Sequence, residues 1–317
     1  MAYSSGGLIS ATDFNGLATT NTSNIGWMWG TGYAQWGYGQ STTLLTSVSA
    51  GATVTATQWA GLIYTLNKAL AHQGQTTLGG GPLGANINMT AGQTITYFAN
   101  VGTAITQINT TGNAYYASGT TITGTNFTAA MSFAGSAVSY SFNTARTVTF
   151  AGGADAARYF FNAGGRLQLV ITATNNNATA RSADFVTLLQ TNLGGGIVFQ
   201  NSSTGRTGSS GTLTSSNTTA GYYTLSTTPT TYANLTPGSA TYTYNNDWVR
   251  LNVNSNNPQG TNGDRGSTIT FNIDSATPAQ TNSNFNDAVD VTVTTRIDII
   301  PPETTYLGNV WGVIGIT

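Results

Sequence analysis

VDVTVTTRIDI, residues 289–299, decides the fold class of this chain, because apolar and polar side chains alternate along it. A period of two places alternate residues on one face of a β-strand, so one face can be buried while the other meets solvent. The apolar positions are Val289, Val291, Val293, Ile297 and Ile299. The stretch therefore predicts a strand that covers one side of a hydrophobic core.

The same alternation recurs in AVSYSFN (137–143), RLQLVIT (166–172) and STITFNI (267–273). Turns rich in Gly, Asn, Ser and Pro separate these short strands, a pattern typical of an antiparallel β-sandwich, here predicted to be jelly-roll-like. One helix is expected at SADFVTLLQT (182–191), where it would cap an end of the sandwich.

Two stretches near the N-terminus resemble each other, ISATDFNGLAT (9–19) and VTATQWAGLIY (54–64). Each contains a hydroxyl residue and, three positions later, a side chain that can reach back to form a capping box. The two pairs are Ser10 with Asp13 and Thr55 with Gln58. Both stretches therefore predict helix starts, and the second helix is expected to end near Gly74.

Apolar residues at helical spacing give each predicted helix one apolar face. We predict that these faces form a helix pair, either stapled together or used to dock the body of the protein onto a neighbour. The candidate docking residues are Phe14, Leu17, Trp59, Leu62, Ile63 and Leu66.

Three regions follow from these patterns, with the clearest break at LGGGPLG (78–84). Residues 1–77 are predicted to be a helical docking module with an aromatic Gly-rich loop, 78–130 a β-rich connector, and 131–317 a β-sandwich domain. Within the connector, TYFANVGTAITQI (96–108) also has the pattern of a short helix. The expected fold class is α+β, mainly β, with an N-terminal helix-pair module before the sandwich.

Charged residues are scarce, at 6% of the chain against about 25% in ordinary soluble domains. A polar but uncharged surface suits a protein that packs against copies of itself or against other subunits. The net charge of −1 disfavours nucleic acid as a partner, and no apolar run is long enough to predict a membrane span. The chain has no Cys, which removes disulfides and thiolate chemistry. No secretory signal is recognisable after Met1, so we expect synthesis in a cytoplasm and release by lysis.

Few residues suit catalysis, and we predict that the protein is not an enzyme and binds no metal or cofactor. His72 is the one His, and its position near a helix end favours a structural role. Glycoside hydrolysis needs two carboxylates at a set separation, whereas Glu303 is the one Glu, and Asp287 and Asp290 would point to different faces of a strand. NNPQGTNGDRGS (256–267) is rich in oxygen ligands but lacks the pattern of a calcium loop, so a turn between two strands is expected.

Five aromatic residues interleaved with Gly are the candidates for recognition. They stack on a sugar or a partner in one interpretation, and in the other they fill the gap between helices and sandwich or an interface between subunits. These residues are Trp27, Trp29, Tyr33, Trp36 and Tyr38.

The two helix starts flank GYGQ (37–40), and the second helix ends in HQG. This arrangement resembles the N-terminal module of virion structural and tail-fibre-like proteins of tailed bacteriophages of the cyanophage type. ARTVTFAGGADAARYFFNAGGRLQLVITAT (145–174) is similar to a β-sandwich segment of the same group. The resemblance brings no catalytic residues.

The resemblance implies a structural component of a phage particle, a tail fibre or tail-associated subunit that assembles as a homo-oligomer, with a trimer expected. Its partners would be copies of itself and other virion proteins, and its location the virion. A capsid decoration protein on the head is the first alternative. A carbohydrate-binding adhesin that recognises a host surface glycan is the second.

Overall fold

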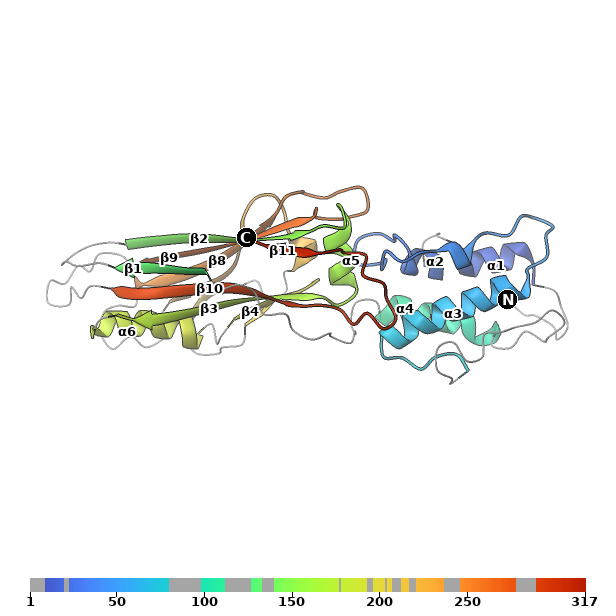
Figure 1. The fold of residues 1–317 in the computed structure, drawn as a ribbon. Helices are drawn as coiled ribbons and strands as arrows, with labels where there is room; N and C mark the ends of the chain where they lie inside the picture. The colour runs from blue at the N-terminus through green and yellow to red at the C-terminus, as the bar shows by residue number, and fades with distance from the viewer. Residues whose placement is uncertain are drawn as a thin grey trace.

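A computed structural model shows helices at one end of the molecule and two antiparallel sheets at the other (Figure 1). The structure describes residues 9–19, 23–79, 98–111, 127–132, 140–176, 178–192, 196–202, 204–206, 212–216, 221–236, 246–277 and 289–317. The predicted fold class, mainly β with N-terminal helices, is confirmed.

Each sheet is named here after one of its inner strands, β10 or β9. The β10 sheet has the order β1 (Phe127–Ser132), β10 (Asp290–Ile300), β3 (Arg166–Asn175), β4 (Ile197–Phe199) and β5 (Thr204–Arg206). The β9 sheet has the order β11 (Ile314–Ile316), β2 (Tyr140–Phe150), β9 (Thr268–Thr277), β8 (Trp248–Ser255), β7 (Thr230–Thr236) and β6 (Thr212–Ser216). Because β6 to β9 are neighbours in both sequence and space, this sheet contains a four-stranded meander, and the jelly-roll-like winding is not confirmed.

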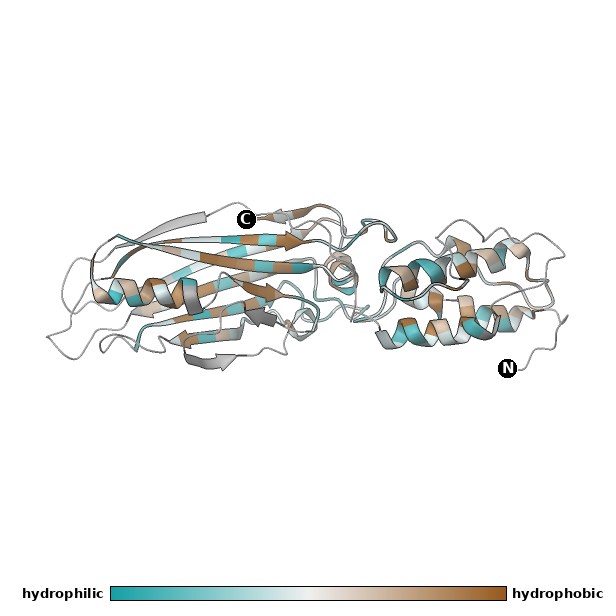
Figure 2. Cartoon of the chain, turned by 90° about the horizontal axis from the view of Figure 1, so that it is seen from below, coloured by the Kyte–Doolittle hydropathy of each residue, from teal (hydrophilic) through white to brown (hydrophobic). Residues whose placement is uncertain are grey.

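The alternation in 289–299 marks the core as expected. Val291, Val293, Ile297 and Ile299 of β10 are buried, and Ile297 lies opposite Leu169 of β3. Rings from the two sheets meet in the interior, where Phe199 and Phe271 are 5.6 Å apart between centroids in a T-shaped pair. The alternating hydropathy along the strands is visible in Figure 2.

Four helices form the helical module: α1 (Ala11–Ala18), α2 (Ile25–Trp29), α3 (Ala56–His72) and α4 (Phe98–Thr111). The predicted helix starts are confirmed, since Ser10 accepts from the Asp13 amide and Thr55 forms a complete capping box with Gln58. A 3₁₀ turn, Thr43–Leu45, precedes α3.

The described part of the 78–130 segment, predicted to be a β-rich connector, confirms the alternative of a short helix near 96–108. Its described residues form α4 and the strand β1, and α4 packs against α1, α2 and α3. Val101 and Ile108 of α4 are fully buried, so this helix belongs to the core of the helical module. The boundaries of the three predicted regions otherwise stay predictions.

Two further helices lie at the sandwich. α5 (Ala156–Asn162) follows β2 at the end that faces the helical module (Figure 1). α6 (Ala180–Thr187) confirms the helix expected near 182–191, although its cap is Thr179, and a π turn, Leu188–Asn192, follows it. A buried ion pair of 2.8 Å between Arg181 and Asp247 fastens α6 beside the start of β8. Burial raises the pKa of Asp247, and hydrogen bonding and charge from Arg181 oppose that shift.

Asparagine side chains join the helices to distant loops. Asn15 of α1 donates to the Val48 carbonyl and accepts from the Val48 amide, both at 2.8 Å. Asn67 of α3 makes the same two-bond pair with Leu78, at 3.2 and 2.7 Å. Each side-chain amide thus bonds to both the N–H and the C=O of one backbone residue, as a residue of a neighbouring strand can. These bonds fix the positions of the loops without using a charged group.

No helix among the described residues has the length and apolar character needed to cross a bilayer.

Replacing Leu62 with Ala should lower the free energy of unfolding by about 2–5 kcal/mol, because its fully buried side chain would leave a cavity in the helical module. Leu44→Ala is the matched control, since the Leu44 side chain is 47% exposed and its loss should change stability by less than about 0.5 kcal/mol. Urea unfolding of both variants measures the difference. Equal losses would contradict the packing described here.

Candidate functional site at the junction of the two parts

The six candidate docking residues lie inside the helical module. Phe14, Trp59, Leu62, Ile63 and Leu66 are buried, and Leu17 is half-buried against the same core. Side chains that pack within their own chain cannot also face a neighbour, so the prediction that they seat the body on another subunit is corrected. They hold the helices together.

The aromatic run divides between core and surface. Trp29 and Tyr38 are buried and form a T-shaped pair with centroids 6.4 Å apart. Trp27 and Trp36 are half-buried and lie 5.4 Å apart, whereas Tyr33 is 46% exposed and accepts a hydrogen bond from Gln259. Trp29 and Tyr38 are therefore core residues, with contacts to Ser41, Lys68, His72 and Gln73 of the N-terminal part, and the other three rings reach the surface.

The loop that carries Tyr33, Trp36 and Tyr38, residues 30–40, turns sharply at two glycines. Gly32 and Gly37 have φ values of 58° and 103°, in the left-handed region. A Cβ on Gly32 would lie 2.2 Å from the Trp36 oxygen, and one on Gly37 would lie 2.1 Å from the Thr31 oxygen. Only glycine permits this close approach. As a result several carbonyl groups of the loop point toward the sandwich.

Arg158 of α5 receives those carbonyl groups. Its guanidinium, which is fully buried, donates to the oxygens of Thr31 at 2.7 Å, Trp36 at 2.9 Å and Ala34 at 3.3 Å. The Asp155 carboxylate balances the charge through a 2.8 Å ion pair. A buried guanidinium is stable only when its donors and its charge are both satisfied, and both conditions are met here.

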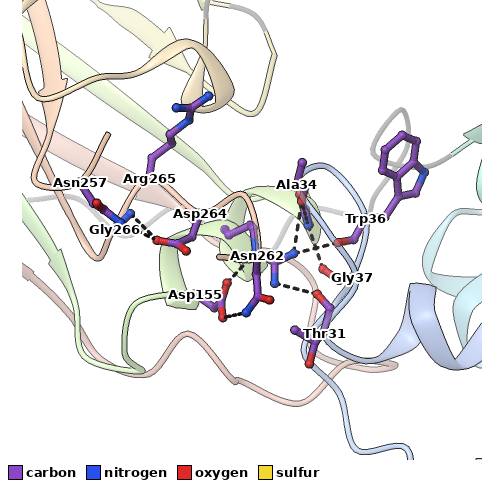
Figure 3. A network of polar contacts seen from close by, with 12 residues as sticks. Thr31, Ala34, Trp36, Gly37, Asp155, Asn257, Asn262, Asp264, Arg265 and Gly266 are labelled. Atoms are coloured by element: carbon purple, nitrogen blue, oxygen red, sulfur yellow. Dashed lines mark hydrogen bonds and ion pairs between the residues drawn. The ribbon is translucent and has the colours of Figure 1, made fainter. Parts of the chain in front are cut away.

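Three other polar residues complete this network, part of which Figure 3 shows from close by. Asn162, one helical turn after Arg158, donates to the oxygens of Ala34 at 3.0 Å and Gly37 at 2.9 Å. The Tyr223 hydroxyl donates to the Ala34 oxygen at 2.9 Å, and burial raises the pKa of this tyrosine. Asn262 accepts from the Ala34 amide at 2.8 Å and donates to Asp155 at 2.7 Å.

The Trp36 indole points away from these polar groups (Figure 3). The network thus binds the backbone of the loop and leaves its large side chains free to pack elsewhere.

Two more contacts join the parts beside the network. Gln40 and Gly308 form a two-bond pair, with the Gln40 amide donating at 3.1 Å and accepting at 2.8 Å. His72, at the end of α3, bonds through Nε2 to the Ala163 oxygen at 3.1 Å. Burial lowers the pKa of His72 to about 4, so the ring is neutral near pH 7. The expected structural role fits this contact, but its reason is burial and not the attraction of a charged ring to the helix dipole.

The charged groups of the Arg158 network are engaged with one another. Its one carboxylate, Asp155, is paired with Arg158, and the described residues contain no group of three or more His, Cys, Asp or Glu side chains that could hold a metal. Glu303 is exposed, and the hydrogen bond from Thr305 lowers its pKa. Asp290 accepts from Asn176 at 3.0 Å, and Asp287 lies outside the described residues.

Residues 256–267 connect β8 to β9, as the turn prediction requires. Asp264 is buried there and accepts from the Gly266 amide at 2.9 Å and from Asn257 at 3.3 Å, so its carboxylate organises the turn.

Comparison with known proteins yields no match: no family model, no curated protein and no solved structure matches the chain. The resemblance to phage virion proteins therefore stays a prediction. Two of the stretches quoted for it, GYGQ (37–40) and 145–174, contact each other at the junction through the hydrogen bond from Asn162 to the Gly37 oxygen.

Arg158→Met should lower the free energy of unfolding by roughly 3–5 kcal/mol, because it leaves buried carbonyl groups and Asp155 without their partner. Arg296→Met is the control. The Arg296 side chain is 31% exposed but its partner Asp298 is 8% exposed, so the loss of Arg296 leaves one buried carboxylate with fewer donors and should cost about 1–3 kcal/mol, less than the loss of the fully buried Arg158. Denaturant titration compares the two variants, and a similar small loss in both would show that the Arg158 network contributes little.

The stability should also depend on pH through His72. Its pKa is 6.5 in the unfolded chain and about 4 in the folded protein, so the unfolded state binds a proton more readily between these values. The stability contributed by the neutral ring is complete above pH 6.5 and is lost as pH falls toward 4, by up to about 3 kcal/mol.

His72→Gln keeps an amide donor at this position and removes the titration. The free energy of unfolding, measured at pH 7, 6 and 5, should therefore fall less steeply in the variant than in the wild type. Identical pH dependence in both proteins would exclude a depressed pKa at His72.

Proposed function

We propose that this chain is a structural subunit of a tailed bacteriophage particle, a tail fibre or tail-associated protein attached through its helical end. The observation that carries the proposal is the junction, where Arg158, Asn162 and Gln40 bind main-chain groups across the two parts. Such a connection holds the sandwich at a set orientation to the helices. A subunit that transmits position or load from an attachment point needs this property, whereas a flexible linker would not provide it.

The composition also favours an assembly protein. With 6% charged residues, the chain has little electrostatic protection against association, which suits a surface covered by neighbouring subunits. We therefore propose a homo-oligomer, with a trimer as the expected state, and other virion proteins as partners. The chain acts in this proposal as a non-enzymatic component without a cofactor.

The helical module is the proposed point of attachment, with its outer surface as the contact. The buried apolar stripe of α3 gives the module a stable core of its own, with Leu62 and Leu66 fully buried. A capsid decoration protein that grips the head through the same module is the alternative, because both roles need a fixed body on an anchoring module.

Gold-labelled antibody against this chain should bind the tails of intact phage particles in electron micrographs. Label spread over the heads would assign the chain to the capsid surface instead. Particles without label, under conditions where the antibody binds the purified protein, would contradict a virion role. Light scattering of the purified chain provides a second check, since a stable monomer would count against the assembly.

A further inference from the structure

The chain contains two Asn-Gly dipeptides, at residues 15–16 and 262–263. Asn-Gly is the dipeptide most prone to deamidation, because glycine has no side chain to shield its amide nitrogen. That nitrogen can attack the carbonyl carbon of the asparagine side chain, which closes a five-membered succinimide ring and releases ammonia. Water then opens the ring to give aspartate or isoaspartate. Water is the one co-reactant, and no catalyst is required.

The second dipeptide lies at the junction, in the loop between β8 and β9, where Asn262 faces Asp155 (Figure 3). Packing requires its glycine, since Gly263 has a φ of 75° and a Cβ there would lie 2.9 Å from the Ala34 nitrogen. Bonding requires its asparagine. The Asn262 main-chain oxygen accepts from the Ala34 amide at 2.8 Å, and its side chain donates to Asp155 at 2.7 Å. The junction therefore needs both residues of a chemically labile pair.

The closed junction holds both reacting groups in other bonds. The attacking nitrogen of Gly263 is buried and donates to the Gly260 oxygen at 3.0 Å. The side-chain amide of Asn262, whose nitrogen would leave as ammonia, is held by Asp155. Ring closure requires the side chain and the Gly263 nitrogen to approach each other, so these two bonds have to break first. Reaction in the folded protein therefore needs a local opening of the junction.

We propose that Asn262 is a deamidation site that reacts when the junction opens, and that its conversion to an acid keeps the junction open. The product carboxylate would replace a donor with an acceptor at the 2.7 Å contact to Asp155. Two carboxylates at this separation repel each other. Isoaspartate also inserts an extra carbon atom into the main chain, which displaces the oxygen that accepts from Ala34.

The Arg158 guanidinium has little capacity to balance the new charge. It already makes four hydrogen bonds, one to Asp155 and three to main-chain oxygens of the 30–40 loop. A guanidinium has five N–H groups, so one remains. A second carboxylate would have to compete with the loop for the other four. Relief of the repulsion therefore comes from separation of the 256–267 loop from α5.

The first dipeptide provides an internal comparison. Asn15 and Gly16 lie within α1, and Asn15 bonds to the amide and the oxygen of Val48, both at 2.8 Å. A Cβ on Gly16 would meet no atom within 4 Å, so packing does not require this glycine. The helix and Val48 protect this site, and Arg158 does not contact it. The two asparagines should therefore respond differently to a change in the junction.

The first test is deamidation of the full chain in mildly alkaline buffer, followed by peptide mass spectrometry, which distinguishes the amide from the acid at each asparagine. Arg158→Met should accelerate deamidation of Asn262 at least about tenfold, because it opens the junction more often, and should leave the rate at Asn15 within about twofold of the wild type. Tyr223→Phe, a milder change that removes one hydroxyl donor to the same loop, should accelerate Asn262 in the same direction.

The second test uses Asn262→Asp, which reproduces one product of the reaction. Hydrogen exchange at the amides of residues 30–40 should be at least about tenfold faster in this variant than in Asn262→Ala, which removes the donor without adding a charge. Asn100→Asp adds the same charge at an exposed position of α4 and should leave exchange in the loop unchanged. Circular dichroism of every variant establishes that the sheets and helices are retained.

Three results would overturn the proposal. Equal deamidation of Asn262 in the wild type and in both junction variants would show that the junction does not control the reaction. A parallel rise at Asn15 and Asn262 would assign the protection to global folding. Equal exchange in Asn262→Asp and Asn262→Ala would show that the acid does not hold the junction open. This chemistry goes beyond the particle role and fails separately from it, because antibody labelling of particles does not depend on the state of Asn262.

Discussion

The burial of the Arg158 guanidinium is the constraint on which the relation between the two parts depends. A charge removed from water is tolerated only where its donors are bonded and its charge is balanced. Asp155 supplies the balance, and carbonyl groups of the 30–40 loop supply the acceptors. Those carbonyls converge because Gly32 and Gly37 permit the turn. The loop, the start of α5 and the placement of the helices therefore form one coupled arrangement.

Away from this site, neutral amides replace charged side chains in joining distant segments. Asn15, Asn67 and Gln40 each donate to and accept from one backbone residue far along the chain. An amide loses less solvation free energy on burial than an ion, and its donor and acceptor match those of a peptide group. The chain can thus be specific in its loop positions with only 6% charged residues. Charged residues are therefore scarce in the bonds that join its own segments as well as on its surface.

Sequence patterns predicted the features that depend on local order. Alternation marked the strands of both sheets, and the spacing of Thr55 and Gln58 marked the start of α3. Features that depend on a partner were not predictable, because an apolar stripe has the same form whether it faces its own chain or a neighbour. The acceptors of Arg158 lie 122 to 127 residues earlier in the sequence, and no periodicity connects them. Arg158 and Asn162 lie in DAARYFFNAGG (155–165), and the resemblance was the one feature of the sequence that pointed to this stretch.

The order of elements along the chain links the junction to the β9 sheet. Asn143 lies on β2, and β2 runs through Phe150 into the turn that begins α5. α5 carries Arg158, which holds the 30–40 loop and, through it, α2 and α3. The β9 sheet is therefore related to the helical end by a strand, a helix and a set of hydrogen bonds to backbone carbonyl groups. A short linker would connect two independent domains but would leave their relative orientation free. The network at the junction instead fixes the orientation of the sheet relative to the helices.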